Sequence, residues 1–143
     1  MTEETMRGFT RAFCHALAAN EPQRIAPFLD DAVEWTVFGP VDLFPFFGQR
    51  RNKAAVIAMC GEIAGCLQLR GCEKESMLID GDKAAALIKL NALYTRSGRI
   101  LSLRLAQFAQ FKGGKLVRLR ALFDSFDAAE QALGHQIDLS EVA

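Results

Sequence analysis

The sequence predicts an α+β fold in which three helices of the N-terminal half pack on a curved, mixed but mainly antiparallel sheet. Apolar residues recur at helical spacing near the N-terminus, whereas alternation with period two dominates the second half. In that half, three turn signals follow one another: Asp80-Gly81-Asp82, Ser97-Gly98 and Gly113-Gly114. A chain of 143 residues suits one core, so residues 1–143 are expected to form one domain.

Each of the three helices has its own local signals. In residues 5–19 the apolar side chains fall on one helical stripe. Pro22 can start a short second helix that continues to Leu29, and Asp30-Asp31 is expected to end it. Asn52 is a suitable N-cap for a third helix from residue 53 to about residue 64.

The strands are predicted from alternation with period two. Residues 33–37 form the first strand, and residues 39–51, which contain two prolines, are predicted to be a loop. Four further strand-like runs follow, at residues 67–80, 83–96, 99–112 and 115–126. In the last run one face holds Val117, Leu119, Ala121 and Phe123, and the other holds Arg118 and Arg120. Helices on the concave face of such a sheet would leave a cavity at its wide end.

Charge and composition exclude several classes of function. The 17 basic and 17 acidic residues balance, so no surface for nucleic acid is expected. The N-terminal segment is acidic and amphipathic, unlike a secretory signal, and no apolar run could span a bilayer. We therefore expect a cytoplasmic protein that binds no membrane. The four cysteines, Cys14, Cys60, Cys66 and Cys72, lack CxxC spacing, so we expect free thiols without a redox role and no metal site.

Three segments carry a resemblance to a known superfamily. They are residues 28–35 (FLDDAVEW), residues 46–56 (FFG followed by NKAAV) and residues 115–124 (KLVRLRALFD). In this order and spacing the chain resembles the nuclear-transport-factor-2-like (NTF2-like) superfamily, and within it the SnoaL-like and ketosteroid-isomerase-like branches. The resemblance implies a cone-shaped fold, a homodimer packed through the sheet, and a deep apolar pocket for a small apolar or cyclic ligand.

The resemblance also implies which residues line this pocket. We expect them to be Phe13, Leu17, Trp35, Phe46, Leu105, Leu119, Ala121, Phe123 and Asp124. Most catalytic groups of the family are absent, because Phe13 stands at the tyrosine position of the steroid isomerases and Trp35 or Thr36 near their general base. Ala121 matches the acid/base aspartate of the SnoaL-type cyclases. Gln107 falls near the second hydrogen-bond donor of the isomerases and can still donate.

Three side chains keep two interpretations each. Asp42 lies beside the apolar run LFPFF, so it is either a base at the pocket mouth or a turn cap in water. Trp35 either offers a flat surface to a bound ring or belongs to the core. Asp124 either enters the pocket or bonds the backbone at the end of its strand.

Two hypotheses about function follow. The first is a pocket protein for a small apolar ligand that acts as an isomerase, cyclase or hydrolase by proton transfer without a cofactor. In it, Asp42 is the catalytic base and Gln107 donates a hydrogen bond to the developing oxyanion. The alternative is a non-catalytic binding or dimeric interaction module. The two differ in whether a carboxylate reaches the interior of the cavity.

Overall fold

The computed structural model describes residues 1–39 and 41–140, so Pro40 of the predicted loop lies outside the described residues. Its helices are α1 (Thr2–Ala19), the 3₁₀ helix η1 (Pro22–Phe28), α2 (Lys53–Cys66) and α3 (Ser125–Leu133). Its strands are β1 (Leu29–Phe38), β2 (Gly48–Arg51), β3 (Leu67–Asp80), β4 (Lys83–Tyr94), β5 (Arg99–Lys112) and β6 (Lys115–Phe123).

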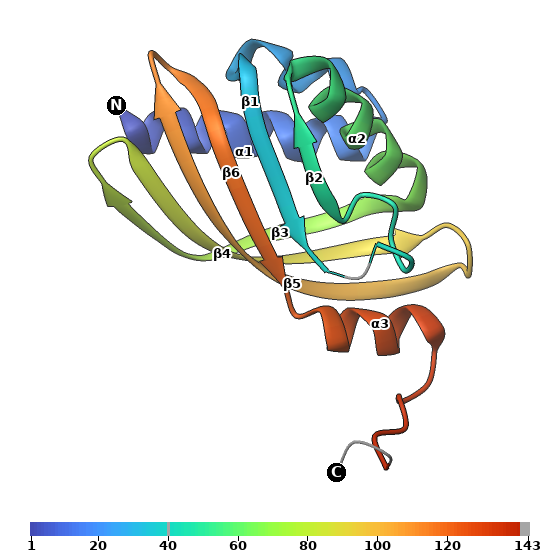
Figure 1. The fold of residues 1–143 in the computed structure, drawn as a ribbon. Helices are drawn as coiled ribbons and strands as arrows, with labels where there is room; N and C mark the ends of the chain where they lie inside the picture. Colours follow the sequence, from blue (N-terminus) through green and yellow to red (C-terminus); the bar gives the residue numbers. More distant parts are fainter. Residues whose placement is uncertain (40, 141–143) are drawn as a thin grey trace.

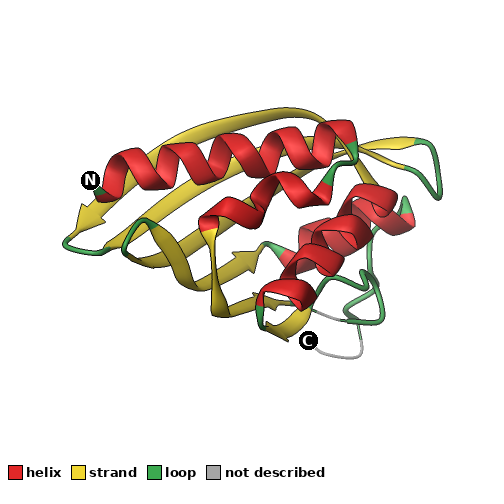
Figure 2. Cartoon of the chain, turned by 90° about the horizontal axis from the view of Figure 1, so that it is seen from above, coloured by secondary structure: helices red, strands yellow, loops and turns green. Residues whose placement is uncertain are grey.

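The strands form one curved sheet in the order β2-β1-β6-β5-β4-β3. β1 runs parallel to β6, and the other neighbouring strands are antiparallel. α1, η1 and α2 cover the concave face, and α3 lies on the opposite side next to β5 (Figure 1 and Figure 2). The predicted class is confirmed: helices of the N-terminal half pack on a mixed, mainly antiparallel sheet, as in a cone-shaped NTF2-like fold.

The predicted helix signals act as expected. The apolar stripe of α1 buries Met6, Phe9, Ala16 and Leu17 against the sheet. At the start of α2, Oδ1 of Asn52 accepts a hydrogen bond from the backbone N–H of Ala55 at 2.9 Å. This bond satisfies one of the free donors of the first turn, so α2 begins where the sequence indicates.

Two elements near the N-terminus differ from the prediction. η1 ends at Phe28, and Leu29–Asp31 already belong to β1 rather than to the end of a helix. Residues 48–51 form the edge strand β2, where a loop was predicted. This strand is short and reads Gly-Gln-Arg-Arg, so it has no apolar alternation. Its pairing with β1, from Glu34 with Arg51 to Val37 with Gly48, determines its conformation.

The last strand is shorter than predicted and is followed by a helix. β6 ends at Phe123, where the sequence indicated residue 126, and α3 begins at Ser125. Oδ1 of Asp124 accepts a hydrogen bond from the backbone N–H of Asp127 at 3.2 Å. Gly134, with φ of 81°, ends the helix in the left-handed conformation that favours glycine. Both signals are present in the sequence and were missed there.

α3 covers a part of β5 that β6 does not reach. β6 pairs with β5 only from Leu105 onward, so the first residues of β5 have no strand on that side. The side-chain amide of Gln131 fills this place: Nε2 donates to the carbonyl of Ser102 at 2.8 Å, and Oε1 accepts from its N–H at 2.7 Å. The backbone N–H and C=O of Ser102 on this open strand edge are thereby satisfied.

Candidate functional site

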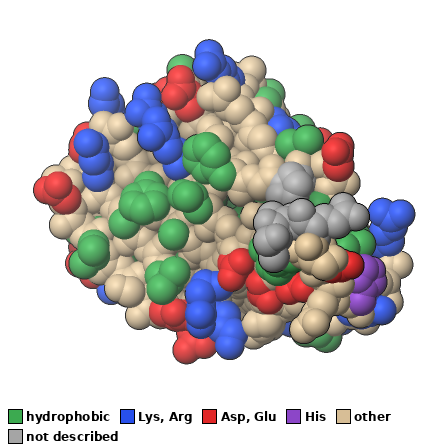
Figure 3. All heavy atoms as spheres, turned by 60° about the horizontal axis from the view of Figure 1, so that its bottom comes forward, with side chains coloured by type: hydrophobic (Ala, Val, Ile, Leu, Met, Phe, Trp, Pro, Cys, Tyr) green, Lys and Arg blue, Asp and Glu red, His purple; other side chains and the backbone are tan. Residues whose placement is uncertain are grey.

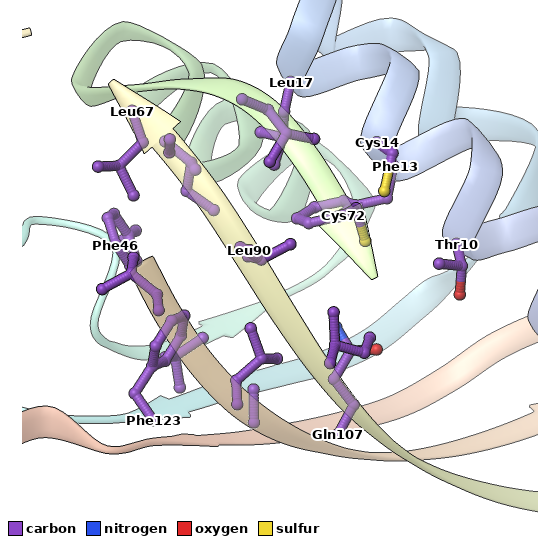
Figure 4. Close-up of a pocket in the computed structure, with 18 of the residues that line it drawn as sticks. Thr10, Phe13, Cys14, Leu17, Phe46, Leu67, Cys72, Leu90, Gln107 and Phe123 are labelled. Carbon is purple, nitrogen blue, oxygen red and sulfur yellow. The ribbon is translucent and has the colours of Figure 1, made fainter. Parts of the chain in front are cut away.

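An apolar cavity lies between α1 and the concave face of the sheet. Side chains from α1, α2, β1 and strands β3 to β6 line it, together with Phe46 from the segment before β2. In Figure 4, Thr10 and Cys14 lie on one side of the cavity, and Phe46 and Phe123 lie on the other. The free volume is about 50 Å³. At about 12 Å³ for each water, this is room for roughly four water molecules, or for one small ring.

Most residues expected to line the pocket do line this cavity. They are Phe13, Leu17, Trp35, Phe46, Leu105, Ala121 and Phe123, and Gln107 joins them. Leu119 is not among the lining residues, and it is fully buried in the core of the protein. Asp124 is not among them either, because it is exposed and caps α3. Of the two interpretations of Asp124, the structural one therefore holds.

Asp42 lies outside the cavity. Its side chain is exposed, and it is not among the lining residues. The aromatic rings of this segment turn inward instead: Phe44 and Phe46 stack with ring centroids 5.2 Å apart, and Phe47 packs 5.6 Å from Phe123. Burying these rings keeps the carboxylate in water, which is the less costly arrangement. The structure therefore places Asp42 away from the cavity, and its role as a base stays a prediction.

Three polar atoms in the cavity wall are buried without a hydrogen-bond partner among residues 1–39 and 41–140. They are Oγ1 of Thr10, Nε1 of Trp35 and Oε1 of Gln107. Trp35 is 2 % exposed and Gln107 is 6 % exposed. An unpaired buried polar atom costs about 1–3 kcal/mol. These atoms comprise a donor, an acceptor and a hydroxyl that can act as either, so they could all be satisfied by a ligand with oxygen substituents.

Aromatic rings form one wall of the cavity. The ring centroid of Trp35 lies 5.6 Å from that of Phe13 and 6.0 Å from that of Phe9. All three residues line the cavity. Trp35 thus belongs to the core and also faces the cavity, which joins its two interpretations. Such a wall suits a flat or cyclic apolar group.

Two cysteines that the sequence analysis set aside also line the cavity. Cys14 comes from α1 and Cys72 from β3. The hydrogen bond from the Cys14 thiol and, to a smaller extent, the charge of the Lys74 ammonium outweigh the effect of burial and lower the pKa of Cys72 to about 7. The same hydrogen bond and burial raise the pKa of Cys14. Fifty-eight positions separate these residues, so no sequence motif indicates the pair.

Acid/base groups of the usual kind are missing from the cavity wall. Within the described part of the chain, its lining includes no Asp, Glu or His. In the same residues, no group of three His, Cys, Asp or Glu side chains could hold a metal ion. None of the described helices is both long and apolar enough to cross a membrane. Chemistry in this cavity would therefore depend on amide, hydroxyl, indole and thiol groups.

The sequence profile of the SnoaL-like domain matches residues 10–119. The chain belongs to the SnoaL-like domain family. This family, a branch of the NTF2-like superfamily, matches the architecture described above, with its helices on the concave face of an unclosed sheet. In this SnoaL-like protein, Ala121 is 3 % exposed and lines the cavity without a reactive group.

Solved structures with the same fold include several bacterial proteins. A "putative isomerase" from Rhodopseudomonas palustris is 38% identical, with a TM-score of 0.89 over 94% of this chain and 100% of that one. A second "putative isomerase", from Bacillus subtilis, is 13% identical, with a TM-score of 0.80 over 96% and 99%. An NTF2-like protein from Burkholderia xenovorans is 15% identical, with a TM-score of 0.75 over 92% and 98%. No protein with a curated function matches this SnoaL-like sequence at a significant level.

Proposed function

We propose that this SnoaL-like protein binds a small, largely apolar molecule of one ring, with one or two oxygen substituents, inside the cavity. The observation that carries the proposal is the set of three unpartnered polar atoms, on Thr10, Trp35 and Gln107, in an otherwise apolar wall. Native proteins leave few buried polar groups unpaired, so three in one cavity favour a bound partner.

The size and shape of the cavity support a ligand of one ring. Its free volume of about 50 Å³ accommodates a six-membered ring more readily than a fused ring system. The walls from Phe9, Phe13 and Trp35 fit the faces of such a ring. A carbonyl or ether oxygen would accept from Nε1 of Trp35, and a hydroxyl would donate to Oε1 of Gln107.

An isomerase-type reaction is the second candidate function. It is favoured by the 38% identity to the Rhodopseudomonas palustris protein over nearly the whole chain. Gln107 keeps its proposed role as a hydrogen-bond donor to a developing oxyanion, because its side chain lines the cavity. Asp42 is not retained as the base, since it is exposed to solvent outside the cavity.

We also propose a homodimer through the outer face of the sheet. Phe38, Leu122 and Ala106 are cross-strand neighbours there, and the first two are 51% and 46% exposed. Figure 3 shows hydrophobic side chains gathered on the face that includes this side of the sheet, with Lys and Arg toward its edge. Water-exposed apolar groups in one row favour a self-complementary contact with a second copy. Leu122→Glu should shift sedimentation toward the monomer mass, and Leu139→Glu in the C-terminal segment should not.

A thermal-shift series tests the proposed ligand class. Cyclohexanone, cyclohexanol and phenol are compared with buffer that contains no ligand and with glycerol as a polar control. A ligand at 100 times its dissociation constant should add about 2.7 kcal/mol to the free energy of unfolding. The proposal predicts a saturable rise in Tm for at least one ring compound, and a smaller rise in Trp35→Phe. If all ring compounds leave Tm unchanged at high concentration, the proposal is wrong.

A further inference from the structure

Two thiols from distant parts of the chain meet at the opening of the cavity. Cys14 of α1 is partly buried, whereas Cys72 of β3 is exposed to solvent, and both line the cavity (Figure 4). A side chain that is both exposed and part of the lining lies where the cavity meets water. The pair is therefore accessible to a ligand entering the cavity.

A β-bulge directs Cys72 into this position. Leu69 pairs with Ala92 of β4, and Cys72 pairs with Leu90, two positions further along that strand. Gly71 between them pairs with Asn91, and Arg70 is the additional residue, so β3 uses three steps where β4 uses two. Without the bulge, strict alternation would point residue 72 away from the helices. Bulges of this kind reorient side chains next to functional sites.

The surroundings of Cys72 favour its thiolate. The Cys14 thiol donates a hydrogen bond to the Cys72 sulfur, and the Lys74 ammonium adds a favourable charge. Together they lower the pKa of Cys72 to about 7 from its ordinary 9.0. The other thiols behave in the opposite way: burial raises the pKa of Cys60 to about 11 and also raises that of Cys66. Cys72 is thus the reactive thiol of the four.

From this geometry we infer that Cys72 is a nucleophile that adds to the conjugated double bond of a small apolar α,β-unsaturated carbonyl compound held in the cavity. The inference rests on the proposed function, because the ligand must first occupy the cavity. Cys14 is a positioning residue, since it acts through the Cys72 sulfur.

The addition balances without an oxidant or a cofactor. The Cys72 sulfur forms a bond to the β-carbon, and the electron pair of the carbon–carbon double bond shifts to join the α-carbon and the carbonyl carbon. The π pair of the carbonyl group moves onto its oxygen. The resulting enolate takes a proton from water at the cavity opening, which replaces the proton that Cys72 released to solvent. Thr10 lies four residues before Cys14 on the same face of α1, and its unpartnered hydroxyl can donate to the developing oxyanion.

The lowered pKa of Cys72 should raise the rate of its addition reaction at pH 7 by a modest and measurable factor. At pH 7 about half of Cys72 is thiolate, compared with about 1% of a thiol of pKa 9.0. A thiolate of lower pKa is intrinsically less nucleophilic, here by about eightfold, so the net gain in rate over a thiol of pKa 9.0 is about sixfold at pH 7. Binding of the ligand before the reaction should add to this gain and make the rate saturate with ligand concentration.

Cyclohex-2-en-1-one is the probe for this reaction. The intact protein is incubated with it, the adduct is followed by mass spectrometry, and the modified cysteine is located by peptide mapping. We expect one adduct, on Cys72, with a rate that saturates and that rises with pH about a midpoint near 7. Cys72→Ser should abolish the adduct, and Cys66→Ser should leave the rate unchanged. Cys14→Ala should move the midpoint upward toward that of an ordinary thiol.

Cyclohexanone, which has no conjugated double bond, separates this inference from the proposed function. If cyclohexanone raises Tm but the enone modifies Cys72 no faster than Cys66, the inference is wrong and the proposed function stands. A rate that is linear in enone concentration, or a midpoint near 9 in the wild type, also contradicts the inference. If cyclohexanone neither raises Tm nor slows the modification of Cys72, binding in the cavity itself is refuted.

Discussion

Replacing Gln107 with leucine should stabilise the protein and weaken ligand binding. Oε1 of Gln107 has no hydrogen-bond partner in the described residues, and an unpaired buried polar atom costs about 1–3 kcal/mol. The cross-strand neighbours of Gln107 are Ala86 and Ala121, whose small side chains leave room for a branched one. We expect the free energy of unfolding to rise by about 1–2 kcal/mol, which raises Tm by about 3–8 °C for a chain of this size. Loss of the acceptor should weaken ligand binding by about 2- to 10-fold.

Urea unfolding measures this change, with an unchanged dependence on denaturant concentration as the check of two-state behaviour. Gln110→Leu is the matched control on the same strand. Nε2 of Gln110 donates to Oδ2 of Asp82 at 3.1 Å, so its replacement removes a bond that is made and should not stabilise the protein. A fall in the free energy of unfolding of about 1 kcal/mol or more for Gln107→Leu would refute the reasoning. It would mean that the Gln107 amide makes hydrogen bonds in the ligand-free protein.

The remaining predictions concern the space in the cavity, the cap of α3 and the side chain of Asp42. Ala121→Leu should fill the cavity, keep the free energy of unfolding within about 1 kcal/mol of the wild type and abolish ligand binding. Ala16 is fully buried outside the lining, so Ala16→Leu should lower the free energy of unfolding, measured in urea, by about 1–3 kcal/mol. Asp124→Ala should lower the free energy of unfolding by about 1 kcal/mol through loss of the α3 cap, while Asp138→Ala should change it by less than about 0.5 kcal/mol. Asp42→Asn should leave the thermal shift caused by cyclohexanone unchanged, because Asp42 is exposed outside the cavity; a clear loss of that shift would return Asp42 to the site.

Local signals were sufficient to predict most of the fold. The N-cap at Asn52 and the turns at Gly81, Gly98 and Gly113 depend on a few adjacent residues, and these elements appear where the sequence indicated. Elements that depend on partners distant in the sequence were harder to predict. β2 has no apolar alternation of its own, and its strand conformation comes from pairing with β1.

Bulges limited the prediction of side-chain direction. Strict alternation placed Val117 on the inner face of β6, but a bulge opposite β5 pairs Phe111 with Leu116, and Leu116 is the buried residue. A bulge in β3 likewise turns Cys72 inward. A single sequence does not reveal where two strands differ by one residue in their pairing. The cavity residues on regular stretches, such as Leu105 and Ala121, were therefore predicted, and the thiol pair was not.

Binding of a ring compound next to Trp35 is the central claim, and the chain contains one tryptophan with which to measure it. The measurement is a fluorescence titration of the wild type and of Ala121→Leu with cyclohexanone. The account predicts a saturable change in Trp35 emission for the wild type, and none for Ala121→Leu, in which the cavity is filled. Emission that does not change, or that changes in the same way in both proteins, would contradict it.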